Sequence, residues 1–228
     1  MRFRRWAVYH APAPGALAEF GAAWLGWDIS RGEAPPPIDI PNLPRPRDEL
    51  TADPRRYGFH ATLKPPFRPA PGVEADDIGR AVEELAARTA PVRIRALSLS
   101  RLGRFLALTA PRDAEALGAV AARCVVALDH LRSPPSVAEL ERRRAADLSA
   151  RQDELLARWG YPFVLDEFRF HMTLTGKLET GETGAVETAL SDALGSLPFA
   201  PSALEHLVLV GEAEDGMFRE IRRCALSG

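Results

Sequence analysis

Two short stretches of the sequence share one pattern, Phe59-His60-Ala61-Thr62-Leu63 and Phe170-His171-Met172-Thr173-Leu174. Side chains alternate between the two faces of a β-strand, so a histidine and a threonine two residues apart point the same way. Their apolar neighbours point the other way. Each stretch therefore predicts a strand that buries one face in a core and presents a histidine and a hydroxyl group on the other. The two histidines are too far apart in the sequence to form a local metal-ligand motif.

The polar face of each predicted strand also carries basic residues. The first face comprises Arg56, Gly58, His60, Thr62 and Lys64, and the second comprises Arg169, His171, Thr173 and Thr175. Lys177 joins the second face if Gly176 does not break the strand. Only two of the 29 basic residues are lysines, and both follow one of the paired histidines. A compact ammonium group suits a phosphate oxygen. We therefore expect Lys64 and Lys177, together with the guanidinium of Arg169, to bind an anionic substrate.

The same succession of elements surrounds each stretch. The first unit has a strand at 57–63, a helix at 74–88, and strands at 92–99 and 105–109. The second has a strand at 168–175, a helix around 186–194, and strands at 204–210 and 217–225. Two such units predict one α+β domain over residues 1–228 with two lobes related by a pseudo-two-fold axis. In this prediction two antiparallel-rich sheets, with helices packed outside them, face each other across a central cleft that contains both histidines.

The remaining segments connect these units. Residues 3–9 predict an opening strand, and apolar residues from Leu17 to Trp27 predict a helix. Residues 34–54 hold seven of the 20 prolines and predict a long loop, either a functional cover or an exposed excursion. The segment 113–159 predicts two helices, at 114–131 and 136–159. Ser136 with Glu139 forms a capping box at the start of the second helix.

Composition excludes several classes of protein. The chain has 228 residues, is 46% hydrophobic, and carries 29 basic against 31 acidic residues, a net charge of −2. This balance argues against a broadly basic nucleic-acid binder and against disorder. No apolar run reaches transmembrane length, no secretory signal is evident, and two cysteines are too few for a disulfide scaffold. We therefore expect a cytoplasmic protein with no membrane partner; its oligomeric state is open.

A pair of histidines across a cleft suits the cleavage of a phosphate diester. In-line displacement needs a base for the attacking oxygen and an acid for the leaving oxygen on the opposite side. Imidazole serves both roles near neutral pH. Thr62 and Thr173 would hydrogen-bond the non-bridging oxygens, and nearby cations would balance the phosphate charge. This chemistry requires no metal and no cofactor, and it leaves open which of His60 and His171 is the base.

The doubled His-x-Thr-Leu resembles the signature of the two-histidine (2H) phosphoesterase superfamily. The flanking strings, residues 57–67 and 159–176, resemble one branch more closely, the uncharacterised proteins associated with bacterial phosphonate-utilisation operons. The resemblance implies a bilobal 2H-phosphoesterase-like fold in which both histidines are catalytic and both threonines bind phosphate. These roles then fall on His60, His171, Thr62 and Thr173. The phosphonate context makes a phosphoribosyl cyclic phosphate a candidate substrate.

Other interpretations of the same residues remain open. An enzyme of RNA ends, which opens 2',3'-cyclic phosphates or makes 2'-5' linkages, is less consistent with the weak net charge. A non-catalytic module could use the same cleft to sense a nucleotide or a phosphorylated sugar. A metal site would need Asp166 or Glu167 beside His171. Strand alternation turns Asp166 away from His171 and pairs each histidine with a threonine instead.

Overall fold

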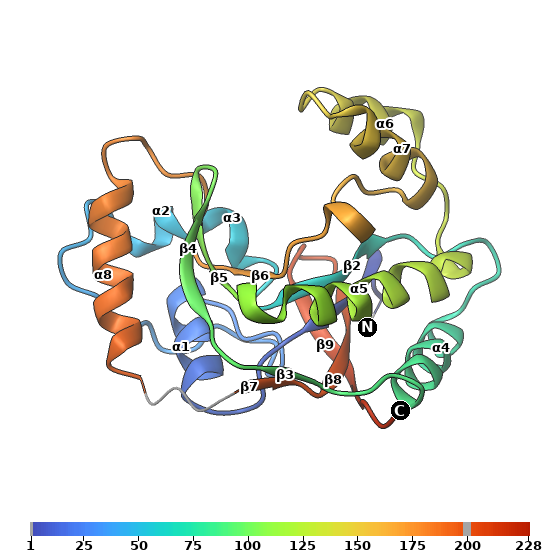
Figure 1. Ribbon diagram of the computed structural model, residues 1–228, viewed down its shortest axis with the longest axis horizontal. Coiled ribbons are helices and arrows are strands. Elements are labelled where there is room, and N and C mark those ends of the chain that lie inside the picture. Colours follow the sequence, from blue (N-terminus) through green and yellow to red (C-terminus); the bar gives the residue numbers. More distant parts are fainter. Residues whose placement is uncertain (1, 198–201) are drawn as a thin grey trace.

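The computed structural model describes residues 2–197 and 202–228, and a seven-stranded sheet runs through its centre (Figure 1). Every pairing in this sheet is antiparallel. A separate two-stranded sheet pairs β3 (Val92–Ile94) with β7 (Ser202–Leu204). In spatial order the strands of the large sheet are β4 (Ser98–Leu102), β5 (Phe105–Thr109), β6 (His171–Thr173), β2 (Ala61–Phe67), β1 (Arg5–His10), β8 (His206–Glu212) and β9 (Phe218–Ala225).

The two motif strands are direct neighbours in this sheet. Ala61 of β2 lies opposite Met172 of β6, and both side chains belong to the main hydrophobic core. The predicted α+β class, with antiparallel sheets and helices outside, is confirmed. The placement of the motif strands in two facing sheets is wrong. Their polar faces lie side by side on one sheet because the strands pair with each other.

The repeated succession of elements is confirmed, with one strand more in each unit than predicted. The first unit runs from β2 through α4 (Ala75–Ala87) to β5, and the second runs from β6 through α8 (Thr183–Gly195) to β9. The predicted strand at 92–99 is divided into β3 and β4. In the second unit β7 precedes β8 in the same way. The first unit's β4–β5 hairpin pairs with β6 of the second unit.

The two faces of the large sheet have different surroundings. On one face, which we call the helix face, α5 (Ala114–Ala127) contacts β2, and α4 contacts β8 and β9. Apolar residues of α1 (Ala16–Leu25) and α8 join the same core. The opposite face, which we call the histidine face, carries a smaller cluster that includes Tyr9, Val208 and Phe218. Figure 1 shows α8 and α4 at opposite ends of the long axis.

The segment between the units differs from its prediction. Residues 136–159 form two helices, α6 (Val137–Arg144) and α7 (Ala150–Trp159). The predicted capping box of Ser136 and Glu139 is confirmed, and a second one at Ser149 and Gln152 starts α7. No residue of α6 is buried. The α6–α7 segment therefore extends away from the sheet, as Figure 1 shows.

The proline-rich segment is not entirely a loop. It contains two single-turn helices, α2 (Arg47–Leu50) and α3 (Ala52–Arg55), of which α3 extends one residue past residue 54. Short 3-10 turns precede α5 at Pro111–Asp113, follow it at Asp129–Leu131, and precede β6 at Leu165–Glu167. Within the described part of the chain, no helix combines the length and the apolar character needed to cross a membrane.

Candidate active site

The register between β2 and β6 brings the four predicted site residues together. Ala61 lies opposite Met172, so the antiparallel register continues with His60 opposite Thr173 and Thr62 opposite His171. Directly opposed residues of antiparallel strands are about 5 Å apart at Cα. The four side chains therefore project from two adjacent strands on the histidine face. All four are partly exposed.

Both imidazoles are held in the same way. Nδ1 of His60 is 2.9 Å from the carbonyl oxygen of Gly58, and Nδ1 of His171 is 2.7 Å from that of Arg169. A carbonyl oxygen only accepts hydrogen bonds, so Nδ1 of each ring carries a proton and Nε2 is the nitrogen left for proton transfer. Nε2 of His60 lies 3.0 Å from Oγ1 of Thr62, which donates to it. Both Nε2 atoms are thus oriented for proton transfer on the histidine face.

Gly58 makes the support of His60 sterically feasible. Its φ is 66°, in the left-handed region that L-residues with a side chain rarely adopt. A Cβ atom at this position would lie 2.3 Å from Cγ2 of Ile29. The backbone turn that directs the Gly58 carbonyl to His60 therefore requires glycine.

Aromatic packing sets the environment of His60. The ring of Tyr9 stacks on the imidazole with centroids 3.6 Å apart and planes 20° apart, and the Tyr57 ring lies 6.4 Å away. Burial lowers the pKa of His60 to about 4, and the charges of His171 and His10 lower it further, whereas the hydrogen bond to Gly58 acts in the opposite direction. His60 is therefore neutral at pH 7 and able to accept a proton.

Residues 62–219 match the family described as "Protein of unknown function (DUF1045)". The chain belongs to this family. It is also 36% identical to "Ribose 1,5-bisphosphate phosphokinase PhnN" of Janthinobacterium sp. (strain Marseille), over 98% of the chain and 51% of that protein. It is 34% identical to the protein of the same name from Laribacter hongkongensis (strain HLHK9), over 77% of the chain and 40% of that protein. The chain thus spans about half or less of the length of these curated relatives.

Three solved structures align with this DUF1045 chain at lower sequence identity. The protein TT0787 of Thermus thermophilus aligns with a TM-score of 0.44 and 17% identity, covering 98% of both chains. A crystal structure described as a phosphoesterase aligns with a TM-score of 0.41 and 15% identity over 99% of both chains. E. coli LigT complexed with 3'-AMP aligns with a TM-score of 0.40 and 14% identity over the full length of both chains.

Lys64 does not lie beside His60 in the DUF1045 protein, contrary to the prediction from strand alternation. Thr62 lies opposite Tyr9 of β1, whereas Lys64 lies opposite Val8, so β2 contains one extra residue between them. This β-bulge reverses the alternation and directs Lys64 to the helix face. Its side chain is buried, and Nζ donates to the backbone oxygen of Val125 on α5 at 3.1 Å. Burial lowers the pKa of Lys64 to about 8.

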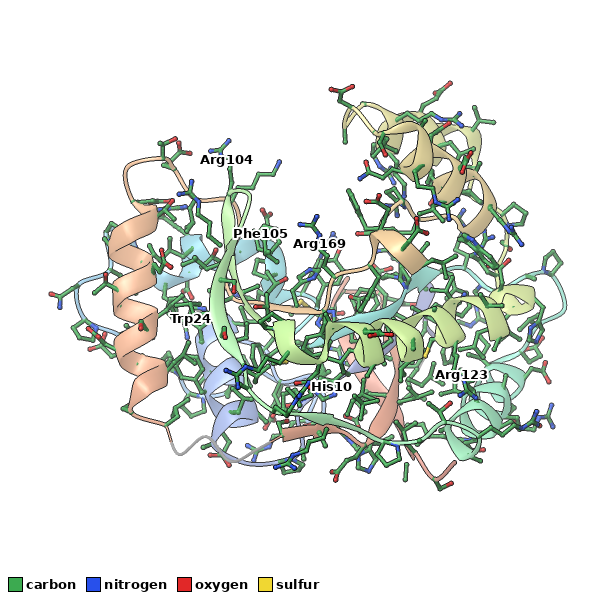
Figure 2. The ribbon with its side chains drawn as sticks, viewed as in Figure 1. His10, Trp24, Arg104, Phe105, Arg123 and Arg169 are labelled. Atoms are coloured by element: carbon green, nitrogen blue, oxygen red, sulfur yellow. The ribbon has the colours of Figure 1, made fainter. Side chains whose placement is uncertain are left out.

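The other two predicted cations are exposed. Arg169 supports His171 through its backbone carbonyl, and Figure 2 shows its side chain between the β4–β5 hairpin and the α6–α7 segment. Lys177 does not continue the strand, because β6 ends at Thr173 and the Gly176 N–H donates to the Leu50 carbonyl. The sequence could not show this early end of the strand. Lys177 therefore does not share the face of His171 by strand alternation.

Two residues of the first unit's hairpin, Thr109 and Phe105, border His171, and a third, Ser100, contacts Thr109; none of them was predicted. Thr109 lies opposite His171 in the β5–β6 register, and its hydroxyl is 2.7 Å from that of Ser100. The Phe105 ring centroid is 5.9 Å from that of His171. Alternation along 105–109 puts Phe105 and Thr109 on one face. However, only the pairing of β5 with β6 reveals that this face adjoins the site.

Neither the acidic residues near His171 nor His10 extends the site. Asp166 pairs with Arg151 at 2.7 Å, and Glu167 accepts a hydrogen bond from Gln152. Across residues 2–197 and 202–228, no three histidine, cysteine, aspartate or glutamate side chains gather as metal ligands. Metal independence itself stays a prediction. His10 is buried, and desolvation lowers its pKa to about 4.

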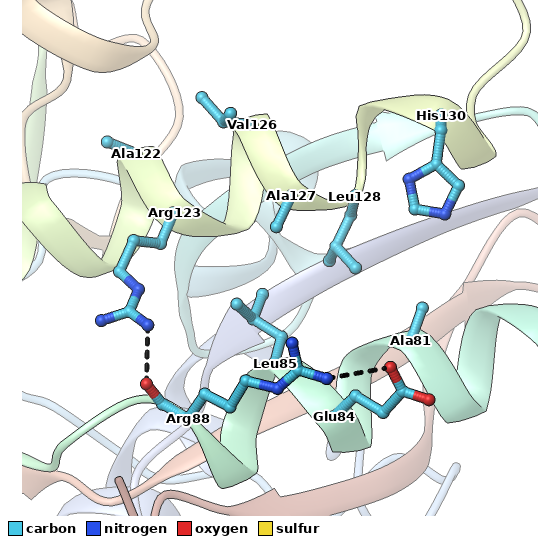
Figure 3. Close-up of a pocket in the computed structure, with 10 residues that line it drawn as sticks. All are labelled: Ala81, Glu84, Leu85, Arg88, Ala122, Arg123, Val126, Ala127, Leu128 and His130. Atoms are coloured by element: carbon cyan, nitrogen blue, oxygen red, sulfur yellow. Dashed lines mark hydrogen bonds and ion pairs between the residues drawn. The ribbon is translucent and has the colours of Figure 1, made fainter.

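A cavity lies on the helix face, away from the histidine pair. It measures about 610 Å³ and is formed between α4 and α5 (Figure 3). Leu85 and Val126 contribute apolar side chains, and an Arg88–Glu84 ion pair of 3.4 Å lies at its margin. The sheet separates this cavity from His60. It therefore contributes nothing to the chemistry of the paired histidines.

Proposed function

We propose that this DUF1045 protein is a phosphoesterase of the two-histidine type, which opens a cyclic phosphate of a ribose-containing small molecule without a metal ion. The main observation behind the proposal is that His60 and His171 are held by the same kind of backbone hydrogen bond. Each Nδ1 is held by the backbone carbonyl two residues earlier, at 2.9 and 2.7 Å. Two isolated structural histidines have no reason to share this arrangement on adjacent strands with a threonine beside each.

The environment of His60 favours the role of general base, which leaves the role of general acid to His171. His60 is neutral at pH 7, because its pKa is lowered to about 4, so its Nε2 takes a proton from the attacking water as the water oxygen bonds to phosphorus. His171 enters the reaction protonated and gives its Nε2 proton to the departing ribose oxygen as the P–O bond breaks. The products are a phosphate monoester and a free hydroxyl group. One water is consumed, and the histidines exchange protonation states.

The threonines and Arg169 stabilise the negative charge of the phosphate. The Thr62 hydroxyl donates to His60 Nε2 at 3.0 Å, and rotation about one bond redirects it to a non-bridging oxygen. Thr173 lies opposite His60 and acts from the other side. Fixed donors aimed at developing charge are among the strongest contributions to catalysis. The exposed guanidinium of Arg169 adds a positive charge next to His171.

The printed names of the relatives support a phosphoribosyl substrate. Two proteins called ribose 1,5-bisphosphate phosphokinase share at least 34% identity with this chain over about half or less of their length. The match alone does not assign the kinase reaction to this chain. Its only Gly-Lys pair continues as Gly176-Lys177-Leu178, where the phosphate-binding loop of many kinases needs Ser or Thr. A cyclic phosphate of a phosphorylated ribose is consistent with both observations.

The test is hydrolysis of α-D-ribose 1,2-cyclic phosphate, with and without a 5-phosphate, in EDTA. Phosphorus NMR identifies the product, and initial rates give kcat and KM. We expect turnover by the wild type and a loss of at least about 100-fold in kcat for His60→Ala and for His171→Ala. His130→Ala is the matched control, because His130 is exposed at the cavity between α4 and α5. Full activity in both site variants would overturn the proposal.

A further inference from the structure

A pocket lined by arginines lies between the end of β2 and the α6–α7 segment. We call it the arginine pocket. Arginine presents a planar fork of donors that matches phosphate oxygens, so several arginines at one hollow indicate an anionic ligand. The rings of Trp159 and Tyr161 also line it. Its basic side chains are Arg5, Arg68, Arg132, Arg142 and Arg143, together with Lys64, whose Nζ lies 3.9 Å from Asp129.

Carboxylates neutralise only part of this positive charge. Three of the arginines have acidic partners, in the pairs Arg5–Glu212 at 2.6 Å, Arg68–Glu139 at 2.6 Å and Arg132–Asp129 at 2.9 Å. Arg143 lies over the Tyr161 ring at 4.7 Å. Among the described residues, neither Arg142 nor Arg143 has an acidic partner within 4.0 Å. Their two positive charges match the charge of a phosphate monoester, about −1.5 to −2 at pH 7.

The arginine pocket adjoins the histidine face through Arg5. Alternation along β1 puts Arg5 on the same face as Tyr9, and its guanidinium carbon is 5.9 Å from the Phe218 ring centroid. The Phe218 ring lies 6.0 Å from that of Tyr9, which stacks on His60. The Tyr57 ring also lies between Phe218 and His60, with its centroid 5.2 Å from that of Phe218 and 6.4 Å from that of His60. Two rings, Phe218 and then Tyr9 or Tyr57, therefore lie between Arg5 and His60.

The size of the pocket favours a single phosphate group. Its volume is about 50 Å³, and one water needs roughly 10–15 Å³ on this measure. This space admits a group about the size of a phosphate. A strand of RNA would need a row of cations along its backbone.

We propose that the arginine pocket binds a second phosphate group of the substrate, so that the enzyme selects cyclic phosphates of a phosphorylated ribose. Arg142 and Arg143 supply the free charge, and Arg5 marks the side that faces the histidine pair. The inference rests on the proposed function, because it names the substrate class of that site. It adds a binding site outside the doubled motif.

The experiment compares two substrates, α-D-ribose 1,2-cyclic phosphate and its 5-phosphate. We expect the wild type to favour the 5-phosphate in kcat/KM by at least about tenfold, with most of the difference in KM, since charge-assisted hydrogen bonds are worth that much. The double variant Arg142→Ala/Arg143→Ala should lose most of this preference. Arg144→Ala is the matched control, because Arg144 lies on the same helix, pairs with Asp153 at 2.6 Å, and is not part of the pocket.

A binding measurement separates failure of this inference from failure of the proposed function. Calorimetry compares ribose 5-phosphate with ribose, using the wild type, the double variant and Arg144→Ala. Phosphate-dependent binding that only the double variant loses supports the pocket, even if no cyclic phosphate is hydrolysed. Equal use of both substrates, or equal binding of both sugars, overturns it. A preference for oligonucleotides with 2',3'-cyclic ends that the double variant abolishes would also overturn it, in favour of RNA.

Discussion

Replacing Lys64 with methionine tests the bulge in β2 directly. The Lys64 side chain is buried, and burial lowers its pKa from 10.5 to about 8. At pH 7 both the folded and the unfolded chain bind this proton, and the lowered pKa corresponds to a cost of about 3 kcal/mol in the folded state. Between pH 8 and 10.5 the folded chain releases the proton first. The unfolded chain then binds more protons, so the free energy of unfolding rises by the same amount.

Lys64→Met removes this pH dependence. At pH 7 the variant avoids the cost of about 3 kcal/mol for burying the charge, but it loses the hydrogen bond to Val125, which is worth about 1 kcal/mol. We therefore expect it to be more stable than the wild type by about 2 kcal/mol. At pH 11 only the loss remains. Urea unfolding of both proteins from pH 7 to 11 measures the difference, from which titrating groups that do not interact with Lys64 cancel.

The second lysine of the chain provides the control. Lys177 is exposed, so Lys177→Met removes no buried side chain and should change the free energy of unfolding only slightly. If the Lys64→Met difference did not change between pH 7 and 11, Lys64 would be solvated in the folded state. The bulge would then not direct Lys64 under α5, and Lys64 would lie on the face of His60, as strand alternation predicts.

Three other substitutions test the support of the site. Between pH 7 and 4, the free energy of unfolding should fall by about 3 kcal/mol less in His60→Gln than in the wild type. In the wild type the unfolded chain binds a proton at His60 near pH 6.5, whereas in the folded chain the pKa of His60 is about 4. Parallel acid-unfolding curves of the two proteins would contradict this. Gly58→Ala should lower both the melting temperature and kcat, by about 1–3 kcal/mol in stability; unchanged stability would show that the turn tolerates a side chain. Tyr9→Phe removes a buried hydroxyl that has no hydrogen-bond partner among the described residues and should stabilise the fold by about 1–3 kcal/mol; a destabilised variant would imply a bound water.

The sequence predicts the site residues because alternation is a local property. His60 and Thr62, like His171 and Thr173, are two residues apart, and both pairs lie on the face that this spacing predicts. Lys64 follows the same rule in the sequence but not in the structure, since the bulge depends on pairing with β1. Lys177 escapes the rule because β6 ends at Thr173. Strand ends and bulges are set by partners that a single sequence does not identify.

The pairing of β2 with β6 also explains why neither repeated unit can form the site alone. β6 is three residues long, and its hydrogen-bonding neighbours are β2 and β5, both from the first unit. The backbone groups that hold His171 and Thr173 in place are therefore satisfied only when the second unit adds its strand to the first. The loss of one histidine's strand would leave the edges of β5 and β2 unpaired. The same pairing that adds β6 to the sheet therefore brings the strand of His171 next to the strand of His60.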